Sequence, residues 1–189
     1  MSKKVQKGFT LIEMLVALAI LSLIVAIGMS VFDGSKSKAQ ALLGLTKQMS
    51  DANIMAKEDI GCFANNPVGL FDQTAANTAY PCKSNPQLTR LYMPRQQTAN
   101  SNTEIKFTKV AEDVTIAFGR VAGGLGNRYY VQAKAVPMDV LKHALSECNG
   151  DTNVGTTMVG VTNLSTFRCV ASTLSGDRGD FYMQYAETR

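Results

Sequence analysis

The chain begins with a polar segment followed by a long apolar run. Residues 9–32 form 24 positions with one formal charge, Glu13, and the preceding residues include Lys3, Lys4 and Lys7. A helix of that length is about 36 Å long, which exceeds the roughly 30 Å of a hydrocarbon core. The run therefore predicts a membrane-spanning helix, with the lysines holding the N-terminus on the cytoplasmic side.

A second helical pattern follows, but it is amphipathic. Its apolar positions recur at spacings of three and four, namely Leu42, Leu45, Met49, Ala52 and Ala56. We expect residues 33–60 to continue the first helix as one rod, which ends near Ile60 because glycine follows at position 61. The apolar stripe is expected to pack on a globular domain.

Short alternating runs fill the rest of the chain and predict an antiparallel sheet. The strand candidates are residues 89–93, 104–110, 113–122, 128–136, 156–162, 166–172 and 180–186. The most specific expectation is a hairpin of 113–122 with 128–136 around a glycine-rich turn at 119–127. Residues 137–148 predict a short helix with proline in its first turn, and residues 61–87 predict a long loop. The fold class is α+β.

Four cysteines are present, at Cys62, Cys82, Cys148 and Cys169. An even count in a domain outside the cytoplasm favours disulfides, and four cysteines allow three pairings. We favour Cys62–Cys82 with Cys148–Cys169, because this local pairing requires the least rearrangement of a sheet-like domain. Each bond closes a loop of about twenty residues, worth on the order of 3 kcal/mol. The absence of C-x-x-C spacing argues against zinc.

Glu13 is the unusual residue of the apolar run, because a carboxylate at membrane depth costs up to about 3 kcal/mol. The segment Gly8-Phe9-Thr10-Leu11-Ile12-Glu13, followed by an apolar run, closely resembles the class III signal of type IV pilins and their pseudopilin relatives. The resemblance implies that a prepilin peptidase cleaves between Gly8 and Phe9 and methylates the new amine. It also implies that Glu13 pairs with the Phe9 ammonium of a neighbouring subunit. An ordinary secretory signal has a shorter apolar core, and a plain anchor gives no reason for Gly8 or Glu13.

The resemblance implies a division of the chain into a leader (1–8), a transmembrane and assembly helix (9–32), its amphipathic continuation (33–60) and a periplasmic or extracellular pilin-like domain (61–189). The chain would sit in the inner membrane before assembly and in an extracellular filament afterwards. Its partners would be other copies in a homopolymer, prepilin peptidase and the inner-membrane assembly machinery. Residues 61–87 and 148–169 would form subunit surfaces. The short leader resembles type IVa pilins, whereas the helix ending in Cys148 resembles type IVb pilins, so the subclass stays open.

Nothing else in the sequence indicates a reaction. The formal net charge is +4, and the three leader lysines leave +1 for the mature chain, so no nucleic-acid partner is expected. The only histidine, His143, has no evident catalytic partners. Residues 175–180 contain two carboxylates that could bind calcium, but the stretch lacks the ligand count of a dedicated site. We expect a solvated turn there. We therefore expect no enzyme, no catalytic residue, no metal and no cofactor.

Three functions remain open on the sequence. The first is a structural subunit of a type IV pilus. The second is a minor pilin or a type II secretion pseudopilin, which shares the features of the first 32 residues. The third is a membrane-tethered binding domain that never polymerises.

Overall fold

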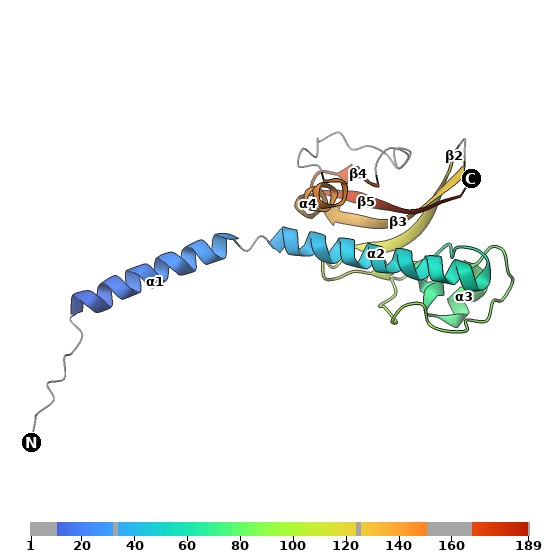
Figure 1. Cartoon of the computed structure of the whole chain (residues 1–189), viewed down its shortest axis with the longest axis horizontal. Coiled ribbons are helices and arrows are strands. Elements are labelled where there is room, and N and C mark those ends of the chain that lie inside the picture. The colour runs from blue at the N-terminus through green and yellow to red at the C-terminus, as the bar shows by residue number, and fades with distance from the viewer. Residues whose placement is uncertain (1–10, 32–33, 124–125, 151–167, 189) are drawn as a thin grey trace, which may run out of the picture. The chain divides into compact units, whose positions relative to one another are not determined.

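The structure, a computed structural model, describes residues 11–31, 34–123, 126–150 and 168–188 (Figure 1). The chain divides into two compact units, one up to Gly34 and one from Ser35 onward. The elements in chain order are α1 (Leu11–Val31), α2 (Gly34–Ile60), the 3₁₀ helix η1 (Pro67–Leu70), α3 (Gln73–Ala79), β1 (Ile105–Lys106), β2 (Thr115–Gly123), β3 (Gly126–Pro137), α4 (Met138–Asn149), β4 (Cys169–Ser175) and β5 (Arg178–Thr188). This is the expected α+β, pilin-like fold, with two disulfides.

The two predicted helical segments are both helical. Between α1 and α2, residues 32 and 33 lie outside the described ranges. The expected end of the rod is confirmed: α2 ends at Ile60. Gly61 follows with a φ of 106° and donates its N–H to the carbonyl of Lys57 at 2.8 Å. Because that φ strongly favours glycine, the residue type itself stops the helix.

An antiparallel sheet with the order β1-β2-β3-β5-β4 forms the centre of the second unit. Paired positions on one face are apolar and buried, in two rows that cross the sheet. One row is Ile116, Ala133, Phe181 and Ala171, and the next contains Val131, Met183 and Cys169. In Figure 1, α2 runs along the sheet. The hydroxyl of Thr46 in α2 contacts the sulfur of Met183 at 3.6 Å, so this buried face is the one that α2 covers.

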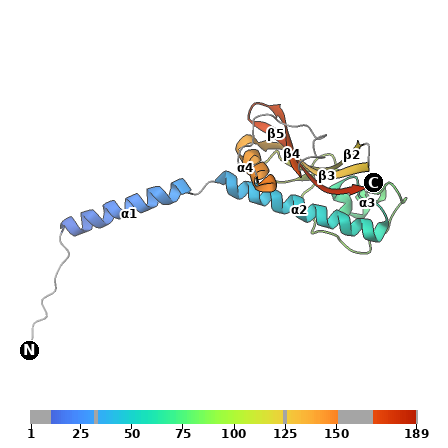
Figure 2. The ribbon, with the colours of Figure 1, turned by 45° about the horizontal axis from the view of Figure 1, so that its top comes forward.

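Helix α4 confirms the short helix predicted at 137–148. Pro137 precedes it, and Gly150 follows it in the left-handed conformation with a φ of 71°. Its buried side chains are Val140, Leu141, Ala144 and Leu145. The hydroxyl of Ser35, in the first turn of α2, donates to the carboxylate of Asp139, so α4 lies beside the start of α2 (Figure 2). Helix α3 lies near the second half of α2 (Figure 2).

The predicted hairpin of 113–122 with 128–136 is confirmed, but the prediction of a turn at residues 119–127 is wrong. Strands β2 and β3 pair in register as far as Gly123 and Gly126, so residues 119–123 belong to the sheet instead of a loop. The ring of Tyr130, the cross-strand partner of Gly119, lies directly over this glycine. A Cβ built on Gly119 would come within 2.4 Å of that ring, so the absence of a side chain at this position leaves room for it. The aromatic ring covers the backbone that the glycine leaves open.

Other strand predictions are only partly correct. Residues 89–93 form no strand, and their Leu91 side chain is 62% exposed. Of residues 104–110, only β1 is a strand, because the chain turns after Phe107 and the Val110 N–H donates to the Phe107 carbonyl. Residues 156–162 lie outside the described residues. The last two candidates, 166–172 and 180–186, correspond to β4 and β5 with shifted ends.

The expected solvated turn at residues 175–180 is also wrong. Only Gly176 and Asp177 form the turn, and Arg178 begins β5. Asp180 is buried and accepts hydrogen bonds from the Gln132 amide at 2.8 Å and from the backbone N–H of Ala135 at 3.1 Å. Ala135 has a φ of 58° at an irregularity between β3 and β5. The guanidinium of Arg178 donates to the carbonyl of Ala135 at 2.7 Å. Two side chains of β5, Arg178 and Asp180, therefore hold the strained backbone of Ala135.

Residues 61–87 are not the long loop that the sequence predicts. They contain η1 and α3, and the first residue before each helix is an asparagine or aspartate. Asn66 accepts from the N–H of Gly69 at 2.9 Å, and Asp72 accepts from the N–H of Ala75 at 3.0 Å. These side chains satisfy backbone donors that a helix start leaves unpaired. Without a repeating apolar period, the two caps are the local signal for these short helices.

Gly69 shows how closely η1 approaches α3. A Cβ built on it would lie 2.4 Å from the Cβ of Ala79, which cannot rotate away. We expect Gly69→Ala to lower the free energy of unfolding by about 2 kcal/mol through overpacking. The measurement is urea unfolding of the full-length chain in detergent, with disulfides intact. The matched variant Gly44→Ala, in an exposed part of α2 with nothing within 4 Å, should instead stabilise by up to about 1 kcal/mol. Equal effects of the two variants would contradict this explanation.

Candidate assembly site

Helix α1 carries an apolar surface on all sides. Every described side chain from Leu11 to Ile24 is exposed within the chain, and ten of these are large hydrophobic residues with exposed fractions from 52% to 81%. Soluble proteins rarely expose a contiguous apolar surface of this kind, which marks a region that binds membrane or protein. Glu13 lies in the first turn of α1, where a negative charge is favourable to the helix dipole.

The predicted cleavage position lies outside the described residues, since Gly8 and Phe9 fall in the segment 1–10. Their roles and that of Glu13 therefore stay predictions. Within the part of the chain that the structure describes, no helix is long and apolar enough to cross a membrane.

Helix α2 buries polar side chains as well as apolar ones, and one of them connects it to other segments. Thr46, Ser50 and Asn53 are all buried, and each has a hydrogen-bond partner. Ser50 donates to the carbonyl of Thr46 at 2.7 Å. The Asn53 amide donates to the Ala64 carbonyl at 3.2 Å and to the Tyr185 hydroxyl at 2.8 Å, and its oxygen accepts from the Ala64 N–H at 2.8 Å. One side chain thus joins α2 to the following segment and to β5.

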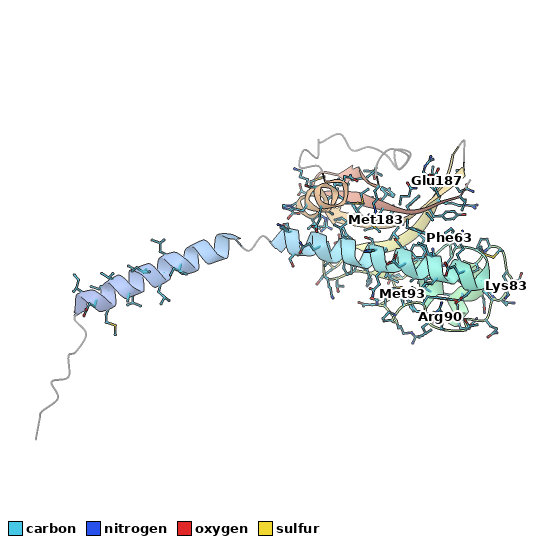
Figure 3. All side chains as sticks on the ribbon, viewed as in Figure 1. Phe63, Lys83, Arg90, Met93, Met183 and Glu187 are labelled. Carbon is cyan, nitrogen blue, oxygen red and sulfur yellow. A yellow bond between two sulfur atoms is a disulfide. The ribbon has the colours of Figure 1, made fainter. Side chains whose placement is uncertain are left out.

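An aromatic cluster surrounds this junction. The Phe63 ring lies 4.3 Å from the Tyr129 ring and 5.5 Å from the Tyr185 ring, measured between centroids. The ammonium of Lys57 lies 4.8 Å from the Phe63 centroid, within range of a cation–π contact. Burial raises the pKa of the Tyr185 hydroxyl well above its usual value, so this group stays neutral and hydrogen-bonded at physiological pH. In Figure 3, Phe63 and Met183 lie between α2 and the sheet.

Both disulfides have the local pairing. Cys62 is bonded to Cys82 and Cys148 to Cys169, each with Cα atoms 6.1 Å apart. The first bond connects the end of α2 to the chain after α3, and the second connects the end of α4 to β4. Asn149 reinforces the second: its amide donates to the Cys169 carbonyl at 2.8 Å, and its oxygen accepts from the Cys169 N–H at 3.1 Å. In the described part of the chain no three potential metal ligands gather.

Sequence reasoning missed the buried polar residues of α2, although a signal for them exists. Thr46 and Asn53 alternate with Leu42, Met49 and Ala56 at spacings of four and three, so they occupy the buried stripe. A polar residue at such a position indicates a buried hydrogen bond. Leu45, which the apolar pattern included, is only partly buried.

The comparison with protein families agrees with the first part of the chain. Residues 3–29 match the family model described as the prokaryotic N-terminal methylation motif, which is the class III signal of type IV pilins. No curated protein and no solved structure matches the chain. The motif and the α+β fold together support a type IV pilin-like or pseudopilin-like protein. The motif further implies processing by prepilin peptidase.

Proposed function

We propose that this chain is a structural subunit of a type IV pilus, cleaved before Phe9 and polymerised through its N-terminal helix. The observation that carries the proposal is the exposed apolar surface of α1 with one acid in its first turn. Such a surface needs to be covered, first by lipid of the inner membrane and then by the helices of other subunits. A helix that is apolar on all sides suits both environments.

The acid gives the assembly a register. Glu13 is costly inside an apolar bundle unless an opposite charge meets it, and cleavage after Gly8 creates such a charge at the amine of Phe9. Pairing the acid of one subunit with the amine of the next is a heterologous contact, which does not close and therefore builds a filament.

The globular unit supports a subunit that works outside the cell. Two disulfides hold the segments 62–82 and 148–169, and such bonds persist in oxidising surroundings. We propose residues 61–87 and 148–169 as subunit surfaces. A secretion pseudopilin would share the N-terminal helix, and the pair of disulfides favours the pilus subunit over it.

The test uses cells that express the full chain together with a pilus assembly system. Mass spectrometry of the purified protein should find a mature N-terminus at Phe9 with one added methyl group. Shearing should release long surface fibres that contain the chain and that disappear on deletion of its gene. A chain that retains Met1, or fibres that persist without it, would refute the proposal. Processed chain confined to the cell envelope would indicate the secretion pseudopilin instead.

A further inference from the structure

A groove of about 690 Å³ opens on the globular unit, and one of its walls lies within the segment 61–87 that we propose as a subunit surface. One wall is formed by η1 and α3, and the other by the segment 95–103. All of these residues belong to the unit that begins at Ser35. Val68 and Phe71 also line the groove, but both are almost completely buried, so they offer little surface to a ligand. A volume of this size is typical of ligand pockets.

The walls carry mainly hydroxyl and amide groups. They include Thr74 and Thr78 on one side and Gln97, Thr98, Asn102 and Thr103 on the other. Each of these side chains can both donate and accept hydrogen bonds. Among the described residues that line the groove, there is no lysine, histidine, tyrosine or cysteine.

One ion pair connects the two walls. A terminal nitrogen of Arg95 lies 3.1 Å from a carboxylate oxygen of Asp72. The hydrogen bond from the Ala75 N–H, together with Arg95, holds the pKa of the Asp72 carboxyl below its usual range. The groove therefore offers a carboxylate acceptor next to a guanidinium donor, with no net charge. This balance does not favour phosphate, nucleic acid or another anionic ligand, which would need unpaired cations.

We propose that this groove binds a neutral saccharide. Each sugar hydroxyl can both donate and accept hydrogen bonds, which matches walls of threonine, asparagine and glutamine side chains. Adjacent hydroxyls suit an acceptor and a donor side by side, as Asp72 and Arg95 provide.

An extended peptide fits the groove less well. Peptides that add to a sheet edge gain affinity from a row of main-chain hydrogen bonds. Here the wall segment makes only an isolated bridge, between Thr98 and Ile105, and Pro94 just before it lacks an N–H. The available edge is too short for such a row.

The experiment measures binding by the full-length chain in an amine-oxide detergent, because detergents with sugar headgroups would compete for the groove. An array of defined neutral and sialylated oligosaccharides is screened first, and the best neutral oligosaccharide is then titrated by calorimetry. We expect a Kd of about 1 mM or tighter. Arg95→Gln should weaken binding at least about fivefold, because it removes the charged donor. Asp72→Asn, which keeps a side chain able to cap α3, should do the same.

Arg90→Gln is the matched control. Arg90 forms an equivalent surface ion pair with Asp59, also at 3.1 Å, but does not line the groove. The Arg90 variant should leave the Kd unchanged within about twofold, because this side chain lies outside the groove. Its stability should also be preserved, since exposed ion pairs contribute little to it. The proposal is overturned if no neutral oligosaccharide binds, if only sialylated ones bind, if an extended peptide binds in their place, or if the two arginine variants behave alike. Because the test uses solubilised subunits, its failure leaves the filament proposal untouched.

Discussion

Replacing Glu13 with glutamine is expected to leave leader cleavage intact while lowering the amount of the chain in sheared fibres at least about tenfold. Glutamine keeps the size of the side chain but removes the charge that would meet the Phe9 ammonium of the next subunit. A tenfold effect corresponds to only about 1.4 kcal/mol, and a charge pair in an apolar bundle is worth at least that. Immunoblots of the sheared and cell-associated fractions, with mass spectrometry of the N-terminus, give both quantities.

Ser22→Ala is the matched control on the same helix. Ser22 is also an exposed polar residue of α1, but its hydroxyl donates to its own helix, at the carbonyl of Ala19. This variant should be cleaved and should enter fibres at the normal level. If the Glu13 variant assembles as well as the Ser22 variant, the acid does not set the register. That result would favour the membrane-tethered binding domain, which has no need of the acid.

Replacing Asn53 with alanine is expected to lower the free energy of unfolding by about 3–5 kcal/mol. The variant removes three hydrogen bonds at a fully buried position and leaves both backbone groups of Ala64 and the Tyr185 hydroxyl without that partner. Each buried polar group left unpaired costs about 1–3 kcal/mol. Urea unfolding of the full-length chain in detergent, followed by near-ultraviolet circular dichroism, measures the change and reports on the tyrosine cluster.

Asn77→Ala tests whether the effect depends on burial. Asn77 is an exposed helical asparagine that accepts one hydrogen bond from Gln73, at 3.1 Å. Its replacement should change stability by no more than about 0.5 kcal/mol. A loss of less than 1 kcal/mol for the Asn53 variant would mean that water or a shifted side chain replaces its contacts, and that α2 is held by apolar packing alone.

The short helices of residues 61–87 could not be predicted from the periodicity of the sequence. A helix of four or seven residues has no room for a repeating apolar stripe, so periodicity cannot detect it. Its stability comes from a cap at one residue and from contacts with distant ones, such as the approach of Gly69 to Ala79. The same applies to residues 119–123, where glycines suggest a turn until the cross-strand ring of Tyr130 is known to cover the backbone.

Asp180 illustrates the problem for buried polar groups. In sequence it follows glycine and arginine in a stretch typical of exposed turns. In the fold it satisfies the backbone of Ala135, a residue 45 positions earlier. Only the pairing of β3 with β5 brings the two together, so no local rule identifies its role.

The sequence by itself determined the features that depend on neighbouring residues: the apolar run with Glu13, the amphipathic helix that stops at Gly61, the hairpin, the α4 segment and the α+β class. Tertiary structure alone decided the buried partners of Asn53 and Asp180, the short helices after Gly61 and the polar groove between α3 and residues 95–103. The physical reason is range. Helix and strand periods are set within a few residues, whereas a buried hydrogen bond or a groove wall depends on which distant segments the fold brings into contact.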